Sequence, residues 1–137
     1  MLNHSDISIL LVTGYSPRRN ALVDLLQDVC GKDTNIQSIA DTSDLVNEIE
    51  VEPKLCLLDL ANIKQPSLEV IKEVKDCFIK TKIIAVHIYS SSILVDPLFQ
   101  AGIVGYLTYE PTRSSIRTAL DCVLSNQNYI PEDILSS

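Results

Sequence analysis

The sequence predicts an α/β fold in which one parallel β-sheet is covered by helices on both faces. Along the chain, five short apolar segments alternate with five segments whose apolar residues recur at helical spacing. Such alternating units make successive strands parallel and join them by right-handed helical crossovers. The central apolar run, residues 55–60, reads Leu-Cys-Leu-Leu-Asp-Leu. A strand this apolar is typical of a sheet that is buried on both faces.

Length and composition fit a single domain of this class. The chain has 137 residues, of which 46% are hydrophobic, with two Phe and no Trp, so Leu, Ile and Val form the core. A domain of this size buries roughly two-thirds of its unfolded surface and needs no disulfide or structural metal. Four widely spaced cysteines form no Cys-x-x-Cys pair, and we expect them to be reduced thiols: Cys30, Cys56, Cys77 and Cys122.

Charge and hydropathy argue against two classes of partner. The net charge is −7, from 11 basic and 18 acidic residues, whereas nucleic-acid binding needs clustered Lys and Arg to neutralise phosphates. No apolar run approaches the roughly 20 residues of a membrane span. Residues 1–8 also lack the basic-then-apolar pattern of a signal peptide. We therefore expect a cytoplasmic protein that binds neither nucleic acid by this segment nor a membrane.

Turn and capping residues mark the boundaries of the predicted elements. Pro17 fits the first turn of a helix that stops at Gly31. Ser67, the serines at 90–92 and Thr112 can cap three later helices. The expected strands are residues 7–12, 36–40, 55–60, 82–87 and 105–109. The expected helices lie between them, at about 16–30, 44–50, 67–78, 92–101 and from 112 onward, before a polar, turn-rich tail.

The strand ends carry the residues that would line a site. The carboxyl ends of parallel strands meet at one edge of the sheet, where open α/β folds bind ligands. This edge would collect Asp59 together with Thr13, Gly14, His87 and Tyr109. A buried Asp is costly unless it is hydrogen-bonded, paired or metal-bound. The chemistry of the site therefore depends on which partners face Asp59.

Three motifs carry a resemblance to a known family. They are Leu-Leu-Asp-Leu at 57–60, Ala-Gly-Ile-Val-Gly-Tyr-Leu at 101–107 and Asn-Tyr-Ile-Pro at 128–131. Over residues 7–131 the chain resembles the receiver domain of bacterial two-component response regulators, and most closely the LuxR-type transcriptional regulators. The resemblance implies a flavodoxin-like (βα)5 three-layer sandwich with a five-stranded parallel sheet of order 2-1-3-4-5.

The resemblance also divides the chain. Residues 1–126 would form the receiver domain. Residues 127–137 would form a C-terminal tail that begins a linker to a possible helix-turn-helix output domain.

The family's phosphorylation chemistry corresponds to this chain only in part. The resemblance makes Asp59, at the end of the third strand, the ancestral phospho-acceptor. The acidic pair that holds Mg²⁺ in the family is replaced by Thr13 and Gly14. The family's Thr or Ser on the fourth strand is replaced by His87, and its Lys on the fifth strand by Tyr109.

These replacements predict weak or absent Mg²⁺-dependent phosphorylation. Mg²⁺ is bound through carboxylates and phosphate, so Asp59 with the Ala61 carbonyl and waters is a poor site. A Tyr in place of the family's Lys removes the charge that stabilises a phospho-aspartate, and an unperturbed imidazole is mostly neutral near pH 7. We expect no metal, no cofactor and no enzymatic activity. The predicted degenerate pocket consists of Thr13, Gly14, Ala61, His87 and Tyr109.

The same replacements suggest what now surrounds Asp59. His87 and Tyr109 can fill the space and donate hydrogen bonds to its carboxylate, which predicts a domain fixed in one conformation. Tyr106 lies where the family has its switch aromatic. Arg18 and Arg19 begin a helix against its dipole. We expect both to be solvated, and contact with an anion or a partner is the alternative.

The leading interpretation is an atypical receiver domain, a signal-transduction and dimerisation module that controls an attached transcription output. Its partners would be a second copy and a histidine kinase or other signalling protein. The copies would pair either through the first and fifth helices or through the fourth helix, fifth strand and fifth helix. Two alternatives stay open: Asp59 as a working phospho-acceptor, or a small effector-binding domain that uses the crevice at Thr13 and Gly14.

Overall fold

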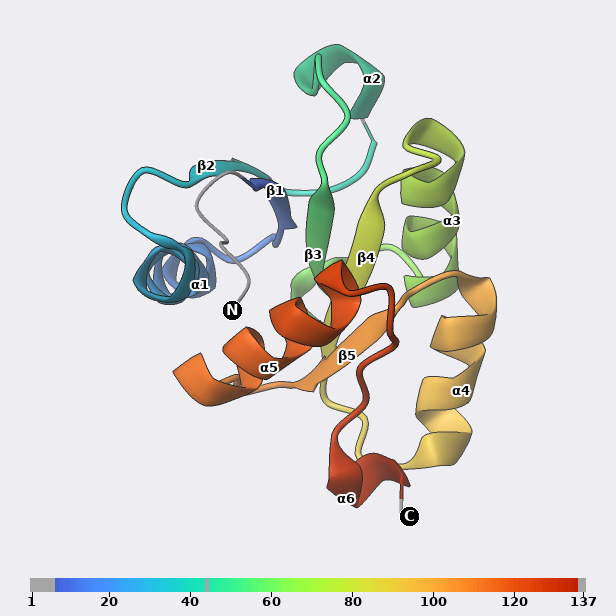
Figure 1. The fold of residues 1–137 in the computed structure, drawn as a ribbon. Helices are drawn as coiled ribbons and strands as arrows, with labels where there is room; N and C mark the ends of the chain where they lie inside the picture. The colour runs from blue at the N-terminus through green and yellow to red at the C-terminus, as the bar shows by residue number, and fades with distance from the viewer. Residues whose placement is uncertain (1–6, 44, 136–137) are drawn as a thin grey trace.

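The computed structural model describes residues 7–43 and 45–135, and its centre is a five-stranded sheet in which all neighbouring strands are parallel (Figure 1). The strand order is β2-β1-β3-β4-β5. The strands are β1 (Ser8–Val12), β2 (Asn35–Ile39), β3 (Leu55–Asp59), β4 (Lys82–His87) and β5 (Gly105–Thr108). The predicted fold class, strand number and strand order are therefore confirmed.

Helices cover both faces of this sheet (Figure 1). α1 (Ser16–Cys30) and α5 (Arg113–Leu124) pack on one face, and α3 (Ser67–Cys77) and α4 (Ser92–Ala101) on the other. The remaining elements are the short helices α2 (Leu45–Glu48), η1 (Leu60–Asn62) and α6 (Glu132–Leu135). None of the helices in the described part of the chain combines the length and the hydropathy that a membrane crossing needs.

The core lies in two layers because side chains alternate along each strand. All five residues of β3 are buried, which explains why the central run is apolar without interruption. The layer beneath α3 and α4 includes Leu10, Val12, Cys56, Leu58, Ile83 and Ala85. The layer beneath α1 and α5 includes Ile9, Leu11, Leu55, Leu57, Ile84 and Val86.

Capping residues set most helix starts as predicted. Thr112 and Ser115 form a reciprocal capping box at α5, in which each hydroxyl oxygen accepts from the other's backbone N–H at 3.0 and 2.8 Å. The Ser91 side chain caps α4. The prediction that Ser67 caps α3 is wrong, because Pro66 is the N-cap residue and Ser67 is already helical. Its hydroxyl faces the site instead.

Helix ends also follow the sequence in part. Gly31 and Gly102 follow α1 and α4 with φ of 113° and 129°, backbone conformations that residues with a Cβ rarely adopt. The helix predicted at residues 44–50 is shorter than expected, since α2 spans only Leu45–Glu48. Residue 44 lies outside the described residues.

The C-terminal segment packs on the domain. The Tyr129 N–H donates to the Val104 carbonyl, and the Tyr106 N–H donates to the Tyr129 carbonyl, both at 2.9 Å. α6 follows, and its Ile134 is completely buried in the layer beneath α4. We call residues 127–135 the C-terminal strap. The sequence predicted a polar tail here. A single apolar residue is enough to anchor a helix as short as α6, and such a helix is too short to show a helical period in the sequence.

Substitutions in α6 test this packing. Ile134→Ala is expected to lower the free energy of unfolding by about 2–4 kcal/mol, because it removes buried atoms and leaves a cavity. Leu135→Ala, at a neighbouring side chain that is 64% exposed, is the matched control. It should change the free energy of unfolding by less than about 0.5 kcal/mol. Urea unfolding followed by circular dichroism measures both values, and equal effects would show that α6 is not packed.

Candidate functional site

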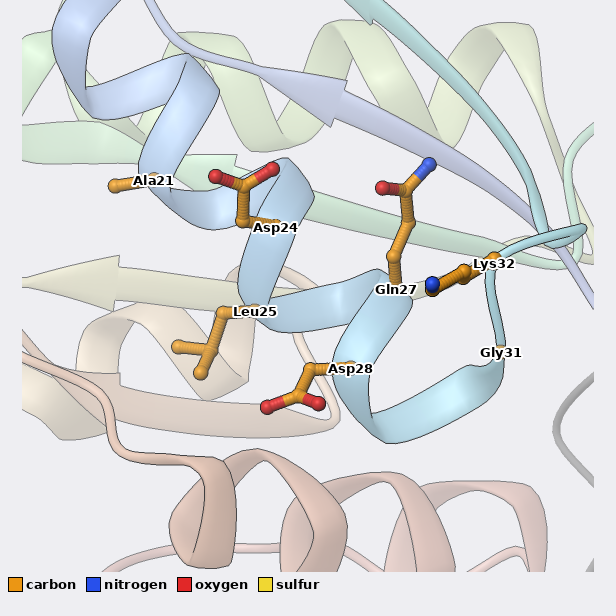
Figure 2. A pocket seen from close by; sticks show the side chains of 7 residues that line it. All are labelled: Ala21, Asp24, Leu25, Gln27, Asp28, Gly31 and Lys32. Atoms are coloured by element: carbon orange, nitrogen blue, oxygen red, sulfur yellow. The ribbon is translucent and has the colours of Figure 1, made fainter.

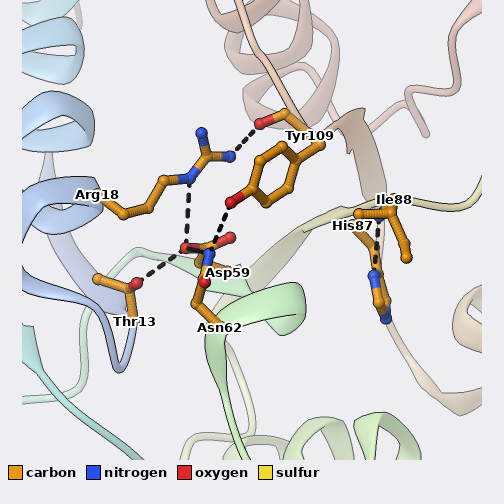
Figure 3. Close-up of polar contacts among 7 residues, drawn as sticks. All are labelled: Thr13, Arg18, Asp59, Asn62, His87, Ile88 and Tyr109. Atoms are coloured by element: carbon orange, nitrogen blue, oxygen red, sulfur yellow. Dashed lines mark hydrogen bonds and ion pairs between the residues drawn. The ribbon is translucent and has the colours of Figure 1, made fainter.

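The candidate site is built around Asp59, the last residue of β3, whose side chain is 0% exposed (Figure 3). Its Oδ2 accepts hydrogen bonds from the Thr13 hydroxyl and from the Asn62 side-chain amide, both at 2.8 Å. Thr13 follows β1, and Asn62 ends η1, so two neighbouring strand ends supply these donors. Among the described residues, Oδ1 is buried without a hydrogen-bond partner.

A cation from α1 completes the contacts of Asp59. The Arg18 Nε lies 3.4 Å from the Asp59 Oδ2, and the Arg18 side chain is only 10% exposed. The guanidinium carbon lies 4.1 Å from the centre of the Tyr109 ring, and Nη2 donates to the Tyr109 carbonyl (Figure 3). Arg18 is thus held both by the carboxylate and by the residue that follows β5.

The expectation that Arg18 is solvated is therefore wrong, although Arg19 is exposed as predicted. A cation in the first turn of a helix opposes the helix dipole, at a cost of roughly 0.3–1 kcal/mol. A buried carboxylate without a counter-charge costs several kcal/mol. The second effect is larger, and the long Arg side chain can span the gap between helix and sheet. The ion pair therefore outweighs the dipole.

Tyr109 and His87 do not hydrogen-bond to Asp59 among the described residues, contrary to the prediction. Tyr109 contributes its ring and carbonyl to Arg18, and its hydroxyl accepts from the Asn62 amide at a long 3.4 Å. Its support for the carboxylate is therefore indirect. Figure 3 shows the His87 ring apart from the cluster around Asp59.

His87 makes its own set of contacts on β4. Its Nδ1 accepts from the Ile88 N–H at 2.8 Å, and its Nε2 lies 3.4 Å from the Ser67 hydroxyl on α3. An acceptor Nδ1 requires the neutral ring with the proton on Nε2. Burial lowers the pKa of His87 below its usual value, while the nearby Asp59 charge acts in the opposite direction. His87 is therefore neutral near pH 7 and supplies no charge to the site.

Gly14 lets two loops approach closely. Its N–H donates to the Asn62 carbonyl at 2.8 Å, and a Cβ at this position would lie 2.5 Å from that oxygen. The contact holds η1 against the loop after β1 and so places the Asn62 amide at the carboxylate. Ala61 lies half-buried in η1. Thr13 and Gly14 also border a hollow of about 90 Å³, with Arg19 at its side.

Tyr106 on β5 is completely buried. Its hydroxyl donates to the Tyr89 carbonyl at 2.7 Å, and burial raises its pKa well above the usual value. The residue at the predicted switch position therefore points inward and is bonded to the loop between β4 and α4.

Two partners of Asp59 escaped the sequence analysis. Asn62 could have been found. When a 3₁₀ turn follows a strand, the residue three positions after the last strand residue lies next to the strand end again. Arg18 had a weaker signal, since only its position in the first turn of the helix after β1 brings it to the sheet edge.

The described residues also show what lies outside the site. A surface hollow of about 690 Å³ lies along α1, and Asp59 is not among the residues that line it (Figure 2). It is lined by Ala21, Asp24, Leu25, Gln27, Asp28, Gly31 and Lys32. The four cysteines are free thiols, and burial raises the pKa of Cys30 to about 11. Within residues 7–43 and 45–135, no three His, Cys, Asp or Glu side chains cluster as metal ligands would.

Comparisons with known proteins identify the fold. No protein-family model and no curated protein matches the sequence. A LuxR-family two-component response regulator from Aurantimonas sp. SI85-9A1 superposes with a TM-score of 0.82 and 19% identity, over 96% of this chain and 94% of that chain. The isolated receiver (REC) domain of RcsB from Salmonella enterica serovar Typhimurium was solved with the phosphomimetic BeF₃⁻. It superposes with a TM-score of 0.78 and 13% identity, over 96% of this chain and 97% of that chain.

This chain has the receiver-domain fold. A structure of two RcsB dimers bound to two parallel DNAs also matches, with a TM-score of 0.79 and 14% identity, over 96% of this chain and 67% of that longer chain. At such identities the likeness establishes the fold, and the function of the receiver-like site has to be argued from its own residues.

A double-mutant cycle tests the buried ion pair. Arg18→Gln is expected to lower the free energy of unfolding by about 3 kcal/mol, because it leaves the Asp59 carboxylate buried without a counter-charge. In the Asp59→Asn background, Arg18→Gln should lower the free energy of unfolding by at least about 1 kcal/mol less than it does in wild type. Arg19→Gln is the matched control on the exposed side of the helix. Denaturant unfolding measures each value, and equal losses for the two arginine substitutions would contradict the ion pair.

Proposed function

We propose that this protein is an atypical receiver domain, a signalling and interaction module that works without Mg²⁺-dependent phosphorylation of Asp59. The observation that carries the proposal is the position of Arg18, a cation of the same chain that covers a fully buried Asp59. This residue stands where an incoming phosphoryl group and its metal would need access to the carboxylate.

The chemistry of phosphoryl transfer supports this reading. Transfer to a carboxylate depends on positioning and on cations that neutralise the transferred group. Thr13 and Gly14 provide no carboxylate for Mg²⁺, and Tyr109 provides no ammonium group. Arg18, the cation that contacts Asp59, is already paired with its carboxylate and bonded to the Tyr109 carbonyl. Phosphorylation would have to break the ion pair before it could use its charge.

The ion pair also suggests how the module is regulated. It ties α1 to the ends of β3 and β5 without any modification, so one conformation is stable by itself. Regulation then acts through partners rather than through a phosphoryl group. A histidine kinase or other signalling protein would act by contact, and the domain would have no enzymatic activity of its own.

The structural neighbours indicate which partners to expect. RcsB is described as dimers bound to DNA, and this chain spans only part of that protein. By analogy, we propose that this chain pairs with a second copy in the cytoplasm and controls a helix-turn-helix output through a linker that starts in the C-terminal strap. Its net charge of −7 is consistent with leaving DNA contact to another domain.

One observation favours a competing function, namely phosphoryl acceptance at Asp59. Its Oδ1 has no hydrogen-bond partner among the described residues, and a nucleophilic oxygen would also be free of such bonds. Acceptance would require Arg18 to leave Oδ2 and expose the carboxylate.

NMR with the phosphomimetic decides between the two functions. We expect addition of BeF₃⁻ and Mg²⁺ to leave the amide spectra of wild type and Asp59→Asn unchanged, because the site lacks both metal ligands and access. The RcsB receiver domain, whose structure was solved with BeF₃⁻, serves as the positive control. Shifts that occur in wild type and disappear in Asp59→Asn would establish a working phospho-acceptor.

The third interpretation, effector binding at Thr13 and Gly14, gives a different result. In a thermal-shift measurement, at least one member of a panel of small anions and organic effectors would then raise the melting temperature of the protein, whereas Mg²⁺ with BeF₃⁻ would not. The small hollow at these residues, about 90 Å³, leads us to expect no shift.

A further inference from the structure

His87 is joined to the C-terminal strap by an unbroken series of contacts. Its ring stacks on the Tyr89 ring, with centroids 4.1 Å apart and planes at 24°. The Tyr89 carbonyl accepts from the Tyr106 hydroxyl at 2.7 Å. The Tyr106 N–H donates in turn to the Tyr129 carbonyl of the strap at 2.9 Å. Two residues, Tyr89 and Tyr106, therefore lie between the His87 ring and the strap.

The hydrogen bonds of the ring depend on its protonation state. Nδ1 accepts from the Ile88 N–H at 2.8 Å, and an acceptor nitrogen carries no proton. A proton on Nδ1 would place two N–H donors face to face, and the bond would be lost. Either the ring or the Ile88 peptide would then have to move. Both lie next to Tyr89 in the loop between β4 and α4.

We propose that His87 is an acid-sensitive latch. In its neutral form it holds the loop between β4 and α4, and through Tyr89 and Tyr106 it holds the C-terminal strap. In its protonated form it releases them. The contacts of the latch do not include the ion pair of Arg18 and Asp59, so the latch does not require phosphorylation of Asp59.

The surroundings of the ring set the pH range. Ser67 on α3, Tyr89 in the loop and Thr108, which is in register with His87 on β5, are uncharged at neutral pH. Asp59 on β3 is the charged group that acts on the ring, and it favours protonation. Burial opposes protonation and is the larger effect, so the pKa in the folded state lies below the usual 6.5.

Because burial is the larger effect, the latched state binds a proton on His87 more weakly than the released state does. Below about pH 6.5 the released state takes up a proton that the latched state resists. Release is therefore favoured as the pH falls from about 6.5 towards the folded-state pKa, and the latch is fully closed above that window. For each unit by which the latched state lowers the pKa of His87, the equilibrium constant for release rises by up to about tenfold at low pH.

An NMR titration from about pH 7.5 to about pH 5 tests the latch across this window. The chain contains two histidines, His4 and His87, so His4→Gln leaves a single imidazole signal to follow. We expect the amides of Ile88, Tyr106 and Tyr129 to shift with the midpoint of the His87 imidazole. Hydrogen-exchange protection of the Tyr106 amide should fall over the same range.

Two substitutions separate the latch from general acid effects. His87→Gln and His87→Phe cannot titrate, and the second retains an aromatic ring that can stack on Tyr89. Both are expected to abolish the common midpoint. If neither variant folds, the shared midpoint in the His4→Gln protein still decides. The proposal is overturned if the Tyr106 and Tyr129 amides show no inflection at the His87 midpoint, or show the same inflection in His87→Gln.

Discussion

The ion pair between Arg18 and Asp59 is the interaction on which the carboxyl edge of the sheet depends. Apolar residues bury the end of β3, and Asp59 is buried with them. A carboxylate there needs a counter-charge and donors, because an unpaired buried charge costs several kcal/mol. Arg18, Thr13 and Asn62 meet this need from three separate elements. The tight approach at Gly14 places one of these donors, the Asn62 amide, at the carboxylate.

The edge of the sheet therefore has two halves that are held by different interactions. On one side, Arg18 connects α1, β3 and the residue after β5. On the other side, His87 connects β4 with α3 and, through the tyrosines, with the C-terminal strap. The first half is held by an ion pair. The second half is held by a neutral imidazole, so a proton changes it. A receiver fold can in this way keep a stable core and still carry a responsive loop.

Much of the fold could be predicted, because alternating apolar and helical periods determine a parallel sheet and its edge. The convergence of Thr13, Asp59, His87 and Tyr109 on that edge needed only this topology. The partners of Asp59 could not be predicted in the same way. His87 ends β4 and Tyr109 follows β5, so both were predicted to bond to Asp59, yet packing directs the His87 ring to α3. It also turns Tyr109 into a platform for Arg18.

By itself, the sequence determined the fold class, since this follows from residue types and their spacing. The resemblance of its motifs to receiver domains implied the strand order and the loss of the metal-binding and ammonium groups. Tertiary structure alone decided that Asp59 is paired by Arg18 and that Ile134 anchors the strap. The reason is physical. Periodicity tells which face of an element is buried, but a long side chain can reach several neighbours. Its choice depends on the free energy of all the buried groups together, and that sum exists only in the folded chain.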